Sequence, residues 1–93
     1  MRILGFDAVP DPDELRFVLD RPLISGSVTY GDPSDARTHP VARAVLDVHG
    51  VAAVTLENNT LTVLKYPDSD WPILLPQIQA AISGSEGERP SAM

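Results

Sequence analysis

The sequence predicts a two-layer α+β domain in which two helices cover one face of a mostly antiparallel sheet of four or five strands. Two observations carry this prediction. The apolar period changes along the chain in the order β-β-β-α-β-β-α. The chain also has 93 residues, 43% of them hydrophobic, which suits one globular core. We expect one domain over residues 1–84 and a disordered tail over residues 85–93.

Three short strands are expected in the first third of the chain. Residues 3–6 form the first, and residues 14–19 alternate so that Leu15 and Phe17 face inward. These two strands are expected to pair as a hairpin with a long, proline-containing loop. A third strand covers residues 28–30 and ends at the turn-forming residues 31–34.

The first helix is expected over residues 38–48. Thr38 is a suitable N-cap, and Pro40 falls in the first turn, where its missing N–H costs little. Gly50 then supplies a left-handed stop. One apolar stripe results, formed by Val41, Ala42, Val45 and Leu46.

A hairpin follows, with strands at residues 51–56 and 61–66. Asn58 and Asn59 are expected to form its turn, because asparagine tolerates positive φ. This turn predicts a register that puts the apolar residues of both strands on one face. The predicted pairs are Glu57 with Thr60, Leu56 with Leu61, and Val54 with Val63.

The second helix is expected to begin near Ser69 and Asp70 and to end at Gly84. Its apolar residues recur with helical spacing, and the first of them, Trp71, is expected to anchor the edge of the core. Pro76 removes one intrahelical hydrogen bond and is expected to kink the helix.

Composition excludes several classes of function. The net charge of −6 disfavours binding to nucleic acid or to anionic membranes. The absence of cysteine removes thiolate ligation of zinc or iron–sulfur clusters within these 93 residues. No apolar run is long enough for a membrane span or a secretory signal. We expect a cytoplasmic protein that binds neither nucleic acid nor membrane and needs no cofactor or metal.

The residues offer no catalytic constellation. His39 and His49 lie ten positions apart on the expected helix, which places them on different faces and ~15 Å apart. We interpret them as helix-start and helix-end residues. No phosphate-binding glycine loop and no nucleophile motif is present. We therefore expect no enzymatic activity.

Four carboxylates gather in eight residues, at Asp7, Asp11, Asp13 and Glu14. Hard cations favour such loops, but the calcium helix-loop-helix pattern fails. Counted from Asp11, its sixth and twelfth positions hold Arg16 and Pro22. A solvated acidic loop explains the run, and a small-ligand or divalent-cation site at Asp11, Asp13 and Glu14 remains the alternative.

Five segments resemble the N-terminal domain of Nfu/NifU-type iron–sulfur scaffold proteins. Residues 10–17, Pro-Asp-Pro-Asp-Glu-Leu-Arg-Phe, are similar to its Pro-Asn-Pro-Asn-Thr-Leu-Lys-Phe signature. The other segments, residues 39–46, 49–54, 61–65 and 70–78, are similar to its later motifs in the same order. The last of them includes the proline at position 76. The likeness covers residues 1–84, and its departures are Asp11, Asp13 and Glu14 in the first signature.

The resemblance implies the same α+β fold and a setting in iron–sulfur cluster assembly or delivery. Two-domain members of the family hold their cluster in a C-terminal domain with a Cys-x-x-Cys pair, and this chain resembles the N-terminal module standing alone. We therefore expect a non-catalytic interaction module that contacts iron–sulfur assembly factors or apo-client proteins. Its expected partner-binding residues are Asp11, Asp13, Arg16 and Arg43; the oligomeric state is not predicted.

Overall fold

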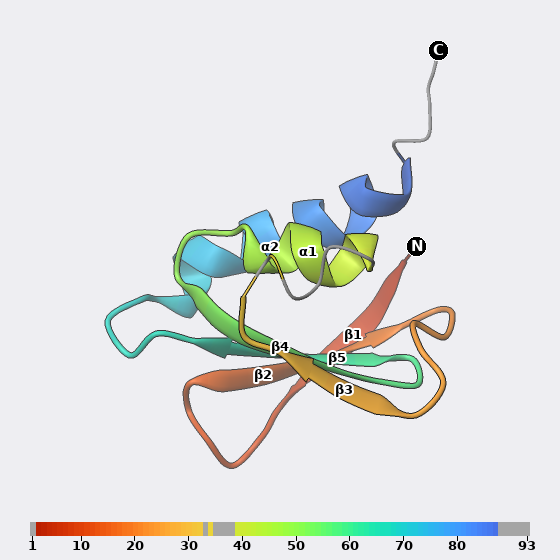
Figure 1. Ribbon diagram of the computed structural model, residues 1–93. Helices are drawn as coiled ribbons and strands as arrows, with labels where there is room; N and C mark the ends of the chain where they lie inside the picture. Colours follow the sequence, from red (N-terminus) through yellow and green to blue (C-terminus); the bar gives the residue numbers. More distant parts are fainter. Residues whose placement is uncertain (1, 33, 35–38, 88–93) are drawn as a thin grey trace.

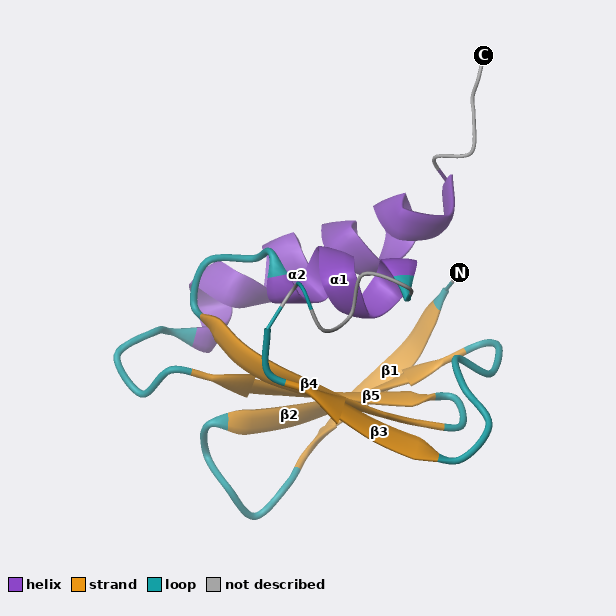
Figure 2. Cartoon of the chain, viewed as in Figure 1, coloured by secondary structure: helices purple, strands orange, loops and turns teal. Residues whose placement is uncertain are grey.

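The computed structural model describes residues 2–32, 34 and 39–87. Both helices lie on the same side of one twisted sheet, as Figures 1 and 2 show. The predicted class and element order are confirmed. The elements are β1 (Ile3–Ala8), β2 (Glu14–Leu19), β3 (Ser27–Tyr30), α1 (Pro40–Leu46), β4 (Val51–Glu57), β5 (Thr60–Lys65) and α2 (Trp71–Gly87).

The sheet has five strands in the order β1-β2-β5-β4-β3, and every neighbouring pair is antiparallel. β1 and β2 form the predicted hairpin, with Phe6 opposite Phe17. The central pairing of β2 with β5 joins segments far apart in sequence and places Phe17 opposite Leu61. The hairpin of β4 and β5, the last two strands in sequence, therefore lies inside the sheet, while β1 and β3 are its edges.

The β4–β5 hairpin has the predicted register. Glu57 pairs with Thr60, Leu56 with Leu61, and Val54 with Val63. Asn58 adopts φ 54°, so the asparagine turn uses the left-handed conformation that its sequence favours. A shift of one residue would turn these apolar side chains to solvent.

The core lies between the sheet and the helices. Because side chains alternate along a strand, one face of β2, β4 and β5 carries the buried apolar residues. These pack against the apolar stripes of α1 and α2. The fully buried large side chains are Phe17, Leu19, Leu56, Leu61, Ile78, Ile82, Val45, Val54 and Val63.

In the described part of the chain, no helix covers the other face of the sheet (Figure 1). Threonines dominate its centre, and the hydroxyls of Thr29 and Thr55 lie 2.9 Å apart across β3 and β4. Arg16 is exposed on this face, because its neighbours Leu15 and Phe17 point toward the helices.

α1 begins with a histidine cap. The Nδ1 atom of His39 accepts a hydrogen bond from the Ala42 amide at 3.3 Å. Its Nε2 atom lies 2.9 Å from the carbonyl oxygen of Leu23, to which it donates when Nδ1 is the acceptor. The predicted cap, Thr38, lies outside the described residues. The helix ends at Leu46, two residues before the expected end, and Asp47 is its C-cap.

α2 begins at Trp71, where the Asp70 carbonyl accepts from the amides of Ile73 and Leu74 at 3.1 Å. It continues through Pro76 and past the expected stop at Gly84 to Gly87. Glycine weakens a helix by about 1 kcal/mol but does not end it unless the chain turns there. Of the expected tail, residues 88–93 lie outside the described part of the chain.

Candidate functional site

Three connections lie at one end of the molecule, at the left and the lower left in Figure 1. They are the β1–β2 loop (residues 9–13), the α1–β4 turn (residues 47–50) and the β5–α2 connection (residues 66–70). The acidic segment singled out from sequence belongs to the first of them. Asp11 and Asp13 thus lie where the loops of both layers approach one another.

The β1–β2 loop is held by its own aspartate. The Asp11 carboxylate accepts a hydrogen bond from the Asp13 amide at 2.9 Å. The backbone carbonyl of Asp11 accepts a second one from the Glu14 amide at 3.0 Å. This is the local side-chain turn that aspartate favours. Asp11 is therefore part of the turn itself.

Asp13 neutralises a buried lysine. The Lys65 ammonium lies 2.9 Å from Oδ1 of Asp13 and 3.3 Å from the Tyr66 carbonyl oxygen. The Lys65 side chain is 9% exposed, and that of Asp13 is 31% exposed. The Lys65 amide also donates to the Asp13 carbonyl at 2.8 Å. These bonds fasten the β1–β2 loop to the end of β5.

Trp71 ties the same loop to α2. Its Nε1 donates to the Pro12 carbonyl at 3.0 Å, and its ring centroid lies 6.0 Å from the Lys65 ammonium. The ring is half-buried and packs against the core, so its predicted anchoring role is confirmed. Lys65 of β5 and Trp71 of α2 thereby both hold the β1–β2 loop.

These contacts disfavour the loop as a cation site. A cation bound at Asp13 would compete with Lys65 for the carboxylate, and loss of the pairing would leave the ammonium buried without a countercharge. Among the described residues, no group of three or more histidine, aspartate or glutamate side chains is placed to hold a metal ion.

The four expected contact residues do not share one surface. Asp11 and Asp13 lie in the end loop, whereas Arg16 is exposed on the sheet face that carries no helices. Arg43 is exposed on α1, in the opposite layer. A single partner would have to wrap around the domain to touch both arginines.

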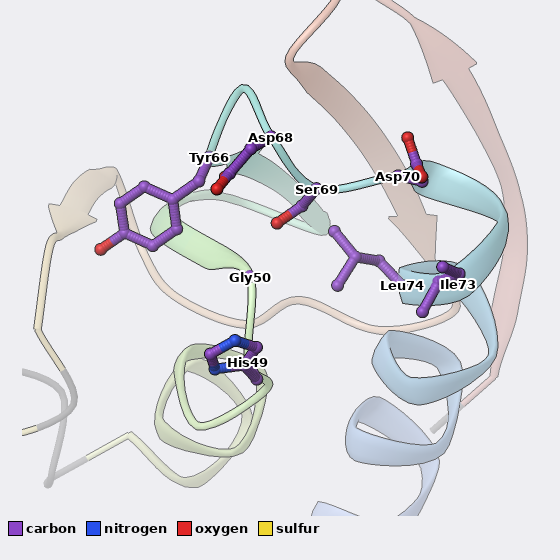
Figure 3. A pocket seen from close by; sticks show the side chains of 8 residues that line it. All are labelled: His49, Gly50, Tyr66, Asp68, Ser69, Asp70, Ile73 and Leu74. Carbon is purple, nitrogen blue, oxygen red and sulfur yellow. The ribbon is translucent and has the colours of Figure 1, made fainter.

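The same end carries a hollow that the sequence did not indicate. Its volume is about 470 Å³, and its wall includes His49, Gly50, Tyr66, Asp68, Ser69 and Ile73 (Figure 3). A second hollow of about 380 Å³ adjoins it and shares His49, Gly50 and Tyr66. We call the two together the Gly50 groove. The sequence signal available for it was an aspartate-rich run between two apolar residues, Tyr66 and Ile73.

Gly50 allows the walls of this groove to meet. Its φ of +107° is the left-handed conformation expected of it, although α1 ends four residues earlier, with Asp47 and not Gly50 at its C-cap. A Cβ at this position would lie 2.8 Å from Oγ of Ser69 and 2.9 Å from Cδ2 of Leu74. An alanine here would adopt a backbone conformation that L residues rarely take, and it would displace the Ser69 hydroxyl and the Leu74 methyl.

One carboxylate of the groove has a perturbed titration. Asp32 lines the second hollow and accepts hydrogen bonds from the Ser34 amide and hydroxyl, each at 2.8 Å. The amide bond, followed by the hydroxyl bond, lowers the pKa of Asp32 below its ordinary value of 3.8. These bonds favour the ionised form at neutral pH.

The fold first defines a class of protein, the two-layer α+β domain with a five-stranded antiparallel sheet. Protein SAV1430 from Staphylococcus aureus has a similar crystal structure, with a TM-score of 0.77 and 23% identity over 87% of this chain and 98% of that one. A NifU-like protein from Saccharomyces cerevisiae gives a TM-score of 0.67 and 16% identity over 89% of this chain and 78% of that one. At these identities the likeness is one of fold.

The sequence comparisons supply the family. Residues 4–86 match the family model described as scaffold protein Nfu/NifU N terminal, and the chain belongs to this family. It is 31% identical over 75 residues to the mitochondrial NFU1 iron–sulfur cluster scaffold homolog of Drosophila persimilis, covering 78% of this chain. It is 32% identical over 76 residues to the mitochondrial NifU-like protein 4 of Arabidopsis thaliana, covering 81% of this chain. The chain spans 27% of the length of each relative.

No helix in the described part of the chain combines the length and the hydrophobicity needed to cross a membrane.

Proposed function

We propose that this domain is a non-catalytic interaction module in iron–sulfur cluster assembly or delivery, acting in the cytoplasm. Its partners would be assembly factors or apo-client proteins. The observation that carries the proposal is the match to the Nfu/NifU N-terminal family over residues 4–86. The name of one relative, an iron–sulfur cluster scaffold homolog, supports the setting.

The chemistry of the chain supports contact with partners over ligation of a cluster. Its 93 residues contain no cysteine, so they supply no thiolate to iron. Of the two histidines, His39 uses both ring nitrogens within the fold, on Ala42 and Leu23. An isolated His49 is too little to hold an iron–sulfur cluster.

The position of the charged side chains bears on which surface is used. Asp13 is paired with Lys65, so its charge is already neutralised within the fold. Asp11, Arg16 and Arg43 remain exposed and are proposed as contact residues on separate faces. Arginine suits such a role because its guanidinium pairs with carboxylates through two parallel hydrogen bonds.

Affinity capture from cell extract tests the proposal. The tagged chain is used as bait, and the captured proteins are identified by mass spectrometry against tag-only beads. We expect enrichment of iron–sulfur proteins or maturation factors, reduced when Arg16→Glu and Arg43→Glu are combined. Failure to enrich any of these, while a known iron–sulfur assembly bait succeeds in the same extract, would contradict the proposal.

A further inference from the structure

The Gly50 groove has a lining that stability of the fold does not explain. Four large apolar side chains are exposed among the described residues, and two of them, Tyr66 and Ile73, line its larger hollow. Tyr66 is 52% exposed and Ile73 is 62% exposed. Exposed aromatic and aliphatic side chains gathered around a hollow are typical of protein-binding surfaces.

The groove is also electrostatically one-sided. Asp68 and Asp70 line the larger hollow, and Asp32 and Asp47 line the smaller one. No lysine or arginine of the described ranges lines either hollow. The whole chain carries a net charge of −6, so its overall charge has the same sign as the carboxylates of the groove and does not neutralise them. The complementary ligand is therefore cationic.

The walls of the groove are already fixed. The Tyr66 amide donates to the Gly50 carbonyl at 2.9 Å, and the Ser69 amide donates to the Tyr66 carbonyl at 3.0 Å. The close approach of Gly50 to Ser69 joins the two connections that form the wall. A ligand would then bind with little loss of conformational freedom in the protein.

The side chains are arranged to meet one extended ligand. In Figure 3, Asp68 and Ser69 lie toward the side occupied by Gly50 and His49, while Asp70 points away at the rim. The Asp68 carboxylate thus lines the larger hollow, whose wall also includes the phenol ring of Tyr66 and the Ile73 side chain. Such a wall offers a charge for a cation, a ring face for a guanidinium, and apolar area for a neighbouring side chain.

We propose that the Gly50 groove binds a polypeptide segment of a partner protein that presents arginine or lysine next to an apolar side chain. The identity of that partner as an iron–sulfur protein rests on the proposed function, whereas the chemistry of the segment rests on the groove. A bare divalent cation fits less well, since no three ligating side chains converge among the described residues.

Titration of the ¹⁵N-labelled chain with short peptides, followed by NMR, tests the inference. The probe is acetyl-Arg-Leu-Arg-Leu-Arg-amide. One comparison peptide replaces each arginine by glutamate, and the other replaces each leucine by serine. We expect saturable shifts of the Gly50, Tyr66 and Ser69 amides with the probe, weaker binding of the serine peptide, and no shifts with the glutamate peptide.

Variants locate the binding. Asp68→Asn and Tyr66→Ala should each weaken the probe by about fivefold or more, as expected for a central contact residue. Glu57→Gln removes an exposed carboxylate at the far β4–β5 turn and should leave the affinity unchanged. Equal weakening by Glu57→Gln, equal binding of the serine peptide, or shifts spread over the helix-free sheet face would show charge attraction without a site and overturn the inference.

The outcomes separate this inference from the proposed function. If the probe binds in the groove but no iron–sulfur protein is captured from extract, the groove is a peptide site and the proposed role in iron–sulfur assembly is contradicted. If Asp68→Asn and Tyr66→Ala leave the capture unchanged and the probe causes no shifts around Gly50, the role in iron–sulfur assembly stands and the groove is not the binding site.

Discussion

Among the described residues, Lys65 is the single buried charged side chain. Its ammonium is matched by the Asp13 carboxylate, the Tyr66 carbonyl and the Trp71 ring. A residue that looks like an ordinary strand lysine in the sequence thus holds the β1–β2 loop in place. Lys65 follows Leu61 and Val63 at intervals of two residues along β5, and this spacing indicates that it faces the same side of the sheet as they do.

Asp13→Asn should destabilise the domain, because it leaves the Lys65 ammonium buried without a countercharge. Since Asp13 is 31% exposed, the expected loss is about 1–2 kcal/mol, below that of a fully buried pair. Urea unfolding measures it, with Glu57→Gln as the control for an exposed carboxylate. Adding Lys65→Met should make the two losses less than additive; equal cost for Asp13→Asn and Glu57→Gln would refute this role.

Gly50→Ala should cost more than Gly26→Ala. Both glycines have positive φ, at +107° and +99°, but a Cβ at Gly26 meets nothing within 4 Å. Backbone strain alone should cost about 1–3 kcal/mol at Gly26. At Gly50 the contacts with Ser69 and Leu74 should add about 1–3 kcal/mol from overpacking. Denaturant unfolding of both variants compares them, and equal losses would contradict the close approach at Gly50.

At the scale of the elements, His39 links two parts of the chain that lie 16 residues apart. One ring nitrogen caps α1, and the other holds the Leu23 carbonyl in the β2–β3 connection. The short helix is therefore fixed at its start by a side chain that also positions a loop. This double role explains why a histidine occupies a cap position.

His39→Ala should lose both contacts and cost about 1–2 kcal/mol of stability. His39→Asn retains a good capping group but does not reach Leu23, so it should recover part of the loss. Thermal unfolding of the two variants, with hydrogen exchange at the Ala42 amide, separates the cap from the loop contact. An alanine variant as stable as the parent would show that neither contact matters.

Local pattern predicted the elements well, because most of their signals are local. The Asn58 turn and the alternation around it determine the β4–β5 register, and Leu15 and Phe17 identify the inner face of β2. The ends of the helices were less predictable. Among the described side chains of α2, Ile82 is the last one buried in the core, yet the helix passes the expected stop at Gly84 and runs to Gly87.

Long-range pairing was beyond local pattern. The pairing of β2 with β5 and the bond between Lys65 and Asp13, 52 positions apart, arise only when the sheet closes. In the sequence, the β1–β2 loop is therefore read as a solvated acidic segment. In the structure, its Asp13 carboxylate is bonded to the buried Lys65. The Gly50 groove was missed for the same reason, because its walls come from separate connections.

At the scale of the whole molecule, the described residues form one helix-covered sheet face, one sheet face without helices, and an end where the β1–β2, α1–β4 and β5–α2 connections lie together (Figure 1). The buried apolar side chains of the sheet pack against the helix layer, whereas Leu4 and Phe6 on the edge strand β1 are exposed. At this end, the bond between Lys65 and Asp13 and the Gly50 groove lie near one another. This end is the surface that the proposed contact function would use.

Anaerobic incubation with ferrous iron and sulfide, followed by desalting and assay of iron per chain, tests most directly whether this domain acts through contact and not as a carrier. We predict a colourless protein with only trace iron, whereas a thiolate-bearing scaffold treated in parallel turns brown. Retention of stoichiometric iron and sulfide, with the charge-transfer absorbance of a cluster, would contradict the account.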